Sequence, residues 1–129
     1  MKKAATVLML LCVTLLSCAV EPCGNTVRYE VNGAALGPVT INIINEFGYA
    51  ERYTAERLPW KTRFKVKERG DEYFGGNFTD GKYTAYVSAI TNNYSGHVTV
   101  AIYLNGKLVQ TGETTINNRQ AEAYYLIHL

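Results

Sequence analysis

The chain from residue 26 onward is patterned as short strands. Apolar and polar residues alternate in successive runs, and no window keeps apolar residues at helical spacing. The runs span residues 27–31, 41–45, 49–56, 60–67, 83–90, 97–104, 107–109 and 121–129. About seven or eight strands with turn residues roughly every 8 to 12 positions are typical of two packed antiparallel sheets. The pattern therefore predicts an all-β sandwich.

Turn residues at three points indicate how the strands are joined. Asn105-Gly106, between two apolar runs, is the strongest hairpin signal because both residues tolerate the positive φ of a type I′ turn. Glu46-Phe47-Gly48 separates two runs that are expected to form another hairpin. Asn32-Gly33 is expected to end the first strand in a turn.

The run from Trp60 to Lys67 has an apolar face and a basic face. Its polar parity continues to residue 69 and carries five cations, which are Lys61, Arg63, Lys65, Lys67 and Arg69. Such a row suits anionic lipid headgroups or acidic glycans. The alternative is a solvated face whose lysines discourage edge pairing, with carboxylates such as Glu51, Glu56 or Glu72 opposite.

Aromatic residues crowd a segment that is interrupted by Gly75-Gly76 and Asp80-Gly81. They are Tyr73, Phe74, Phe78 and Tyr83. Aromatic faces on an adaptable loop are typical of sugar or peptide binding. Equally, these rings fit a structural role in which they fold back and cap the open end of the sandwich.

The N-terminal stretch has the organisation of a bacterial export signal. Lys2 and Lys3 precede an uncharged apolar run over residues 4–16, which is too short to span a bilayer comfortably. Residues 15–18 read Leu-Leu-Ser-Cys and resemble the lipobox, in which the cysteine is acylated and cleavage precedes it. We expect a signal peptide over 1–17, lipidation of Cys18, a tether over 18–25 and a sandwich domain over 26–129. The alternative is ordinary cleavage after Ala19.

Composition and charge narrow the function classes. The 129 residues and 47% apolar content suit one domain. The 13 basic side chains include Lys2 and Lys3, so processing leaves 11 basic against 11 acidic side chains, and nucleic acid is an unexpected partner. No Cys-x-x-Cys pair or metal-ligand spacing occurs, and the two histidines stand apart from any local catalytic motif. No cofactor, metal or enzymatic activity is expected.

Three stretches resemble the MmpS family of small mycobacterial membrane proteins and their lipoprotein relatives. They are residues 27–33 (VRYEVNG), 58–60 (LPW) and 95–107 (SGHVTVAIYLNGK), in the family's order and approximate spacing. The resemblance implies an immunoglobulin-like β-sandwich outside the membrane. It also implies an accessory role beside an exporter of the resistance-nodulation-division type. Two departures stand out, since a lipobox replaces the transmembrane helix and residues 71–82 are longer than usual.

These observations favour a lipid-anchored, non-enzymatic interaction module of the cell envelope, with an envelope protein or transporter as partner. An outer membrane is the expected site in a two-membrane cell, because Ala19 is not the aspartate that retains some lipoproteins at the inner membrane. One alternative is a glycan- or lipid-binding surface module that uses the aromatic segment. Another is a structural surface or adhesin-type protein.

Overall fold

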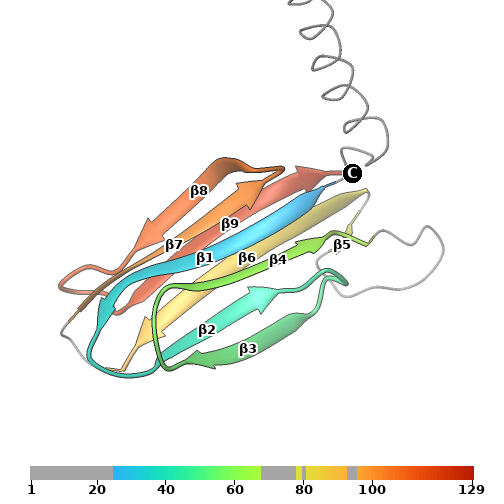
Figure 1. The fold of residues 1–129 in the computed structure, drawn as a ribbon. Coiled ribbons are helices and arrows are strands. Elements are labelled where there is room, and N and C mark those ends of the chain that lie inside the picture. The colour runs from blue at the N-terminus through green and yellow to red at the C-terminus, as the bar shows by residue number, and fades with distance from the viewer. Residues whose placement is uncertain (1–24, 68–77, 80, 93–95) are drawn as a thin grey trace, which may run out of the picture.

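The computed structural model describes residues 25–67, 78–79, 81–92 and 96–129, and these residues form strands joined by turns (Figure 1). The strands are β1 (Thr26–Ala35), β2 (Val39–Ile44), β3 (Ala50–Ala55), β4 (Trp60–Lys65), β5 (Phe78–Thr79), β6 (Lys82–Thr91), β7 (Gly96–Leu104), β8 (Lys107–Glu113) and β9 (Gln120–His128). The all-β prediction is confirmed, and β5 is a two-residue strand that the sequence pattern did not indicate.

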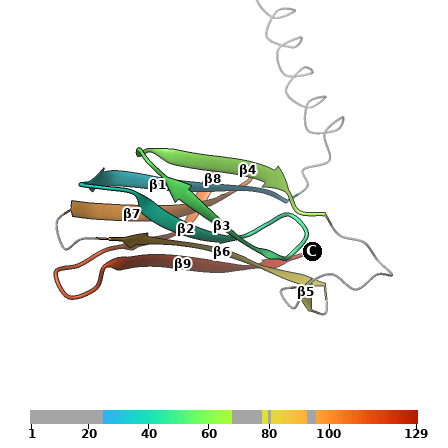
Figure 2. The ribbon, with the colours of Figure 1, turned by 90° about the horizontal axis from the view of Figure 1, so that it is seen from below.

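The strands form two antiparallel sheets that pack as two layers (Figure 2). Sheet A has the order β4-β1-β7-β8. Sheet B has the order β3-β2-β6, and β9 pairs with the other side of β6. The short β5 pairs with the start of β6. The sequence prediction of a β-sandwich is therefore confirmed.

The chain crosses repeatedly between the two sheets. The β2–β3 hairpin belongs to sheet B, whereas β4 returns to sheet A and pairs with β1. The next long strand, β6, pairs with β2 in sheet B. Such alternation gives each sheet strands that are distant in sequence. The β7–β8 hairpin then extends sheet A beyond β1, before β9 closes sheet B.

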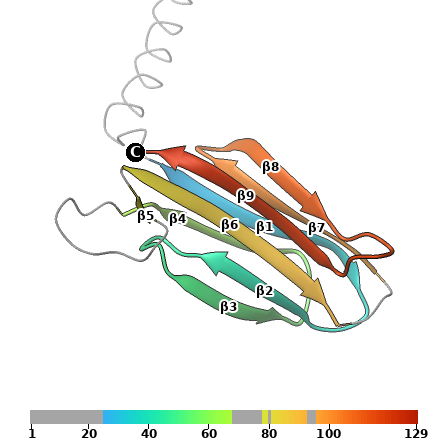
Figure 3. The same ribbon diagram turned by 180° about the vertical axis from the view of Figure 1, so that it is seen from behind.

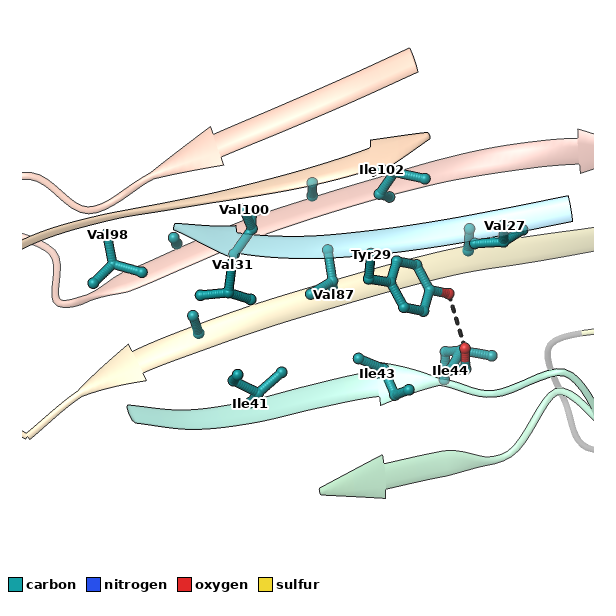
Figure 4. Close-up of a cluster of buried hydrophobic side chains, with 14 of the residues drawn as sticks. Val27, Tyr29, Val31, Ile41, Ile43, Ile44, Val87, Val98, Val100 and Ile102 are labelled. Carbon is teal, nitrogen blue, oxygen red and sulfur yellow. Dashed lines mark hydrogen bonds between the residues drawn. The ribbon is translucent and has the colours of Figure 1, made fainter. Parts of the chain in front are cut away.

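The core is built from the inward parity of the long strands (Figure 4). Sheet A contributes Val27, Tyr29, Val31, Val98, Val100 and Ile102, and sheet B contributes Val39, Ile41, Ile43, Tyr83, Ala85, Val87, Ala89, Ala121, Ala123 and Ile127. Each fully buried valine or isoleucine side chain contributes about 1.5–3 kcal/mol. The alternation seen in the sequence thus defines the buried face of each strand.

The two Asn-Gly pairs behave differently. Asn105-Gly106 forms the β7–β8 turn with φ values of 52° and 83°, as predicted. The prediction of a turn at Asn32-Gly33 is wrong, because β1 continues through it and pairs with β7 as far as Ala35. Gly33 instead permits a close approach at φ 122°, since an added Cβ there would lie 2.1 Å from the carbonyl oxygen of His97.

One side of the sandwich is closed by contact between β8 and β9, which run along the same side (Figure 3). Gly112 on β8 approaches the backbone of Glu122 on β9, and an added Cβ would lie 2.0 Å from the Glu122 carbonyl oxygen. The two strands therefore cover each other's outer edges. The opposite side is bounded by β3 and β4, the other two edge strands of the sheets.

Candidate functional site

The outer surface of sheet A carries the basic row that the sequence predicted. Along β4, Lys61, Arg63 and Lys65 are exposed, while the alternate residues Trp60, Thr62 and Phe64 are half-buried. The interpretation of this strand as apolar on one face and basic on the other is therefore confirmed. Lys67 is exposed beyond the end of β4, and Arg69 lies outside the described residues.

The neighbouring strand β1 adds an arginine to this row. Its register places Arg28 directly opposite Arg63, Glu30 opposite Lys61 and Thr26 opposite Lys65. Directly opposite residues of an antiparallel pair have Cβ atoms about 4.5–5.5 Å apart, so Arg28 and Arg63 start from adjacent points on one surface. We call Arg28, Lys61, Arg63 and Lys65 the cationic face.

Glu30 neutralises only part of the cationic face. Its carboxylate lies 3.6 Å from Nε of Arg28 and 3.4 Å from Nζ of Lys61, and its side chain is 11% exposed. Within the described ranges, neither Arg63 nor Lys65 forms an ion pair. The single Glu30 carboxylate thus interacts with two of the four cations of the cationic face.

Tyr103 on β7 holds the guanidinium of Arg28 in place. The Arg28 guanidinium carbon lies 4.1 Å from the centroid of the Tyr103 ring, a cation–π contact of about 0.5–1 kcal/mol at an exposed site. Nε of Arg28 is buried without a hydrogen-bond partner in the described structure. Stacking and burial therefore restrict this arginine before any ligand arrives.

Charge is graded along the outer surface of sheet A. The far end of β7 carries His97, whose Nε2 lies 2.9 Å from a carboxylate oxygen of Glu113 on β8. Between this pair and the cationic face lies a shallow depression. Thr99, Ala101, Tyr103, Leu108 and Thr111 are among the residues that line it. The Glu113 carboxylate is thus separated from the arginines by uncharged side chains.

The cationic face begins at the end of the sandwich where the chain enters β1. The amide of Thr26 donates to Oδ1 of Asn105 at 2.9 Å, and the amide of Val66 donates to the carbonyl of Asn25, also at 2.9 Å. These bonds fix the entry point between the end of β4 and the β7–β8 turn. Lys107 is exposed at the start of β8, directly after that turn, so further positive charge lies at this end.

Of the four aromatic residues that the sequence suggested as a ligand site, Tyr83 is the one whose side chain lies within the described part of the chain. Tyr83 is fully buried, and its hydroxyl donates to backbone carbonyls at the end of β2, so its assignment as a ligand-binding residue was wrong. The physical reason is that Tyr83 occupies an inward position of β6. Phe78 pairs with it as part of β5, whereas Tyr73 and Phe74 lie outside the described residues.

Sequence reasoning missed Arg28 and Tyr103 as parts of the basic surface. Arg28 lies on the polar parity of its strand, and that signal placed it on an outer face. Its position beside Arg63 depends on the β1–β4 register, which joins residues far apart in sequence. Tyr103 belongs to a third strand and is reached through the β1–β7 register.

Comparison of the sequence with protein-family models and with curated protein sequences finds no match. Among the described residues, no group of three or more histidine, cysteine or acidic side chains is placed to hold a metal ion. The same part of the chain contains no helix with the length and apolar character needed to cross a membrane. Cys18 and residues 19–24 of the tether lie outside the described residues.

Proposed function

We propose that the protein is a lipid-anchored, non-enzymatic interaction module of the bacterial cell envelope, held at the membrane by acylation of Cys18. The observation that carries this proposal is the entry of the chain beside the cationic face. A lipobox-like sequence ends eight residues before β1, and β1 begins next to Lys65. Charge suited to an anionic surface and a signal for lipid attachment therefore belong to the same end of the domain.

The tether limits how far the domain can move from the bilayer. Residues 18–25 span at most about 27 Å when fully extended. Two or more acyl chains on Cys18 supply stable anchoring where one chain gives only marginal binding. The sandwich is then retained close to the membrane, where a partner embedded in that membrane is accessible to it.

The resemblance to the MmpS family supports a protein partner within the envelope. Its three stretches map to β1, to the start of β4 and to the β7–β8 hairpin, which all belong to sheet A. An exporter-type transporter in the same membrane is the partner class that this likeness suggests. An outer membrane remains our proposal for a two-membrane cell.

Two measurements on the native host test this function. Intact-mass analysis of the membrane-derived protein should find an N-terminus at Cys18 with added acyl mass, and Cys18→Ala should release the chain from the membrane fraction. Crosslinking in intact cells should then recover an envelope protein from wild type and not from Cys18→Ala. An unacylated mature chain that begins at Val20, or an acylated chain that crosslinks to no envelope protein, contradicts the proposal.

The outer surface of sheet B supports a second candidate function, binding of a glycan. Tyr86 on β6 and Tyr124 on β9 lie directly opposite each other, and Tyr124 is 65% exposed. The Tyr86 hydroxyl donates to Glu122 at 2.8 Å, and Arg52 donates to Asn42 at 3.0 Å on the same surface. Aromatic rings flanked by positioned polar groups are typical of ligand surfaces that orient sugars.

A glycan array tests this second function directly. Binding by the wild-type protein should be lost in Tyr124→Ala and retained in Tyr49→Ala, which truncates a tyrosine exposed in the β2–β3 loop. An array without signal, or equal binding by both variants, removes the candidate.

A further inference from the structure

Two arginines share one cross-strand position on the cationic face. Arg28 and Arg63 are direct partners in the β1–β4 register, and both project from the outer surface because their neighbours Val27 and Phe64 face the core. Like charges directly opposite each other destabilise a sheet. Glu30 relieves this repulsion only in part, since its carboxylate is shared between Arg28 and Lys61.

The surroundings of Arg28 and Arg63 favour the binding of an anion. The guanidinium carbon of Arg28 lies 4.1 Å from the centroid of the Tyr103 ring, and the Arg28 Nε is buried without a hydrogen-bond acceptor in the described structure. Lys61 and Lys65 flank Arg63 on the same strand, each about 6.6 Å away along it. Paired guanidinium groups offer planar forks of donors that match phosphate oxygens, and lysines add charge to such a site.

We propose that the cationic face binds the phosphate groups of anionic phospholipids, so that the sandwich lies with the outer surface of sheet A against the bilayer that holds its anchor. This inference rests on the proposed attachment through Cys18. Charge complementarity supports it, since this surface carries four cations and one carboxylate that partly neutralises them. The position and length of the remaining chain support it too, because the tether enters sheet A beside Lys65.

The grading of charge defines how the surface meets the membrane. Glu113 and His97 lie at the far end of β7 and β8, away from the tether. The arginines and Lys65 lie nearer to the entry of the chain. Anionic headgroups therefore attract the tether end most strongly, and the far end is left available to a protein partner.

Lysine acylation on vesicles tests the orientation. The full-length acylated protein is reconstituted into vesicles of phosphatidylcholine alone, or of equal parts phosphatidylcholine and phosphatidylglycerol. A membrane-impermeant amine reagent is added, and peptide mass spectrometry measures the rate at each lysine. Lys61 and Lys65 should react about fivefold more slowly on the anionic vesicles, whereas Lys82 on sheet B should react at the same rate on both.

Arginine variants and high salt test whether the arginines cause the protection of Lys61 and Lys65. Arg28→Gln combined with Arg63→Gln should abolish the protection, and the matched control Arg52→Gln with Arg57→Gln, which removes the same charge elsewhere, should retain it. Wild-type protection should also disappear at about 1 M salt, where the Debye length falls to about 3 Å. Circular dichroism checks that each variant is folded.

Each contrary outcome has a distinct meaning. Equal rates on both kinds of vesicle, or protection that survives in the double arginine variant, overturn the inference. Equal protection by inorganic phosphate on neutral vesicles overturns the bilayer as the occupant and assigns the site to a soluble phosphate compound. Intact mass is measured on the same sample, so a missing acyl group contradicts the anchoring itself, whereas an acylated chain with unprotected lysines contradicts only this orientation.

Discussion

The hydroxyl oxygens of Tyr29 and Tyr83 lie 3.4 Å apart, and both reach the carbonyl oxygen of Ile44, at 2.8 and 2.9 Å. Tyr29 belongs to β1 in sheet A, while Tyr83 and Ile44 belong to sheet B. The Tyr29 oxygen also accepts a hydrogen bond from the amide of Tyr86 at 3.1 Å. A polar connection therefore joins the two layers within an otherwise apolar core.

Loss of either hydroxyl should destabilise the sandwich. Tyr29→Phe leaves the partly buried Tyr86 amide without this acceptor, and Tyr83→Phe removes the donor to Asn45, so each should lower the unfolding free energy by about 1–3 kcal/mol. Urea unfolding measures the change, with Tyr124→Phe as an exposed control that should stay within about 0.5 kcal/mol. The double variant should be non-additive, because both hydroxyls share one carbonyl. Additive losses would show that the two groups act independently.

Alkaline pH should weaken the fold through the same pair. Burial raises the pKa of Tyr29 from 10.0 to about 12, and burial also raises the pKa of Tyr83. Because the folded protein keeps the Tyr29 hydroxyl protonated to higher pH than the unfolded chain does, this tyrosine contributes its full stabilisation below pH 10. The contribution is lost as the pH rises from 10 to about 12. The unfolding free energy should therefore fall by about 1.4 kcal/mol per pH unit for each tyrosine. Tyr29→Phe should remove its share of this slope in urea titrations, and an unchanged slope would contradict the assignment.

Adding one methyl group at Gly112 should disturb the contact between β8 and β9 and so lower the stability of the protein. Gly112→Ala places a Cβ 2.0 Å from the Glu122 carbonyl oxygen, so the two strands must separate, and we expect a loss of at least about 1–3 kcal/mol. Gly37→Ala is the matched control, since an added Cβ there meets nothing within 4 Å. Thermal unfolding of the two variants tests the difference. Equal midpoints would show that β8 and β9 do not need this approach.

Glu30→Gln should change stability and membrane affinity in opposite directions. It removes the carboxylate that lies near both Arg28 and Lys61, so the cations repel each other and the unfolding free energy should fall by about 1 kcal/mol. The same change adds one net positive charge to the cationic face, so protection of Lys65 on anionic vesicles should increase about fivefold. Reduced protection in a folded Glu30→Gln protein would argue against headgroup binding there.

The sequence pattern was sufficient where local chemistry determines the structure. Asn105-Gly106 forms the predicted turn because the required backbone conformation depends on those two residues. The alternation along Trp60–Lys65 likewise fixes which side chains face the core. Asn32-Gly33 shows the limit of this reasoning. Pairing with the neighbouring strand β7 carries β1 through that dipeptide, and no local signal in residues 32–33 indicates such a partner.

For a related reason, only part of the cationic face could be predicted from the sequence. Lys61, Arg63 and Lys65 share a strand, so their common face follows from a period of two. The meeting of Arg63 with Arg28 depends on register between distant strands, and a shift by one residue would place Arg28 on the opposite face. Tyr83 was misassigned because an aromatic residue beside glycines fits a binding loop as well as a core strand.

The side of the sandwich bounded by β3 and β4 contains an intrinsic fluorescent residue. Trp60 on β4 is the only tryptophan in the chain, and its ring lies 5.4 Å from the ring of Tyr53 on β3, so the contact joins the edge strands of the two sheets. Because the indole is half-buried at this junction, its fluorescence emission depends on whether the two edges stay together. Emission from the unlabelled protein can therefore follow a local parting of the layers on this side, separately from the global loss of β structure.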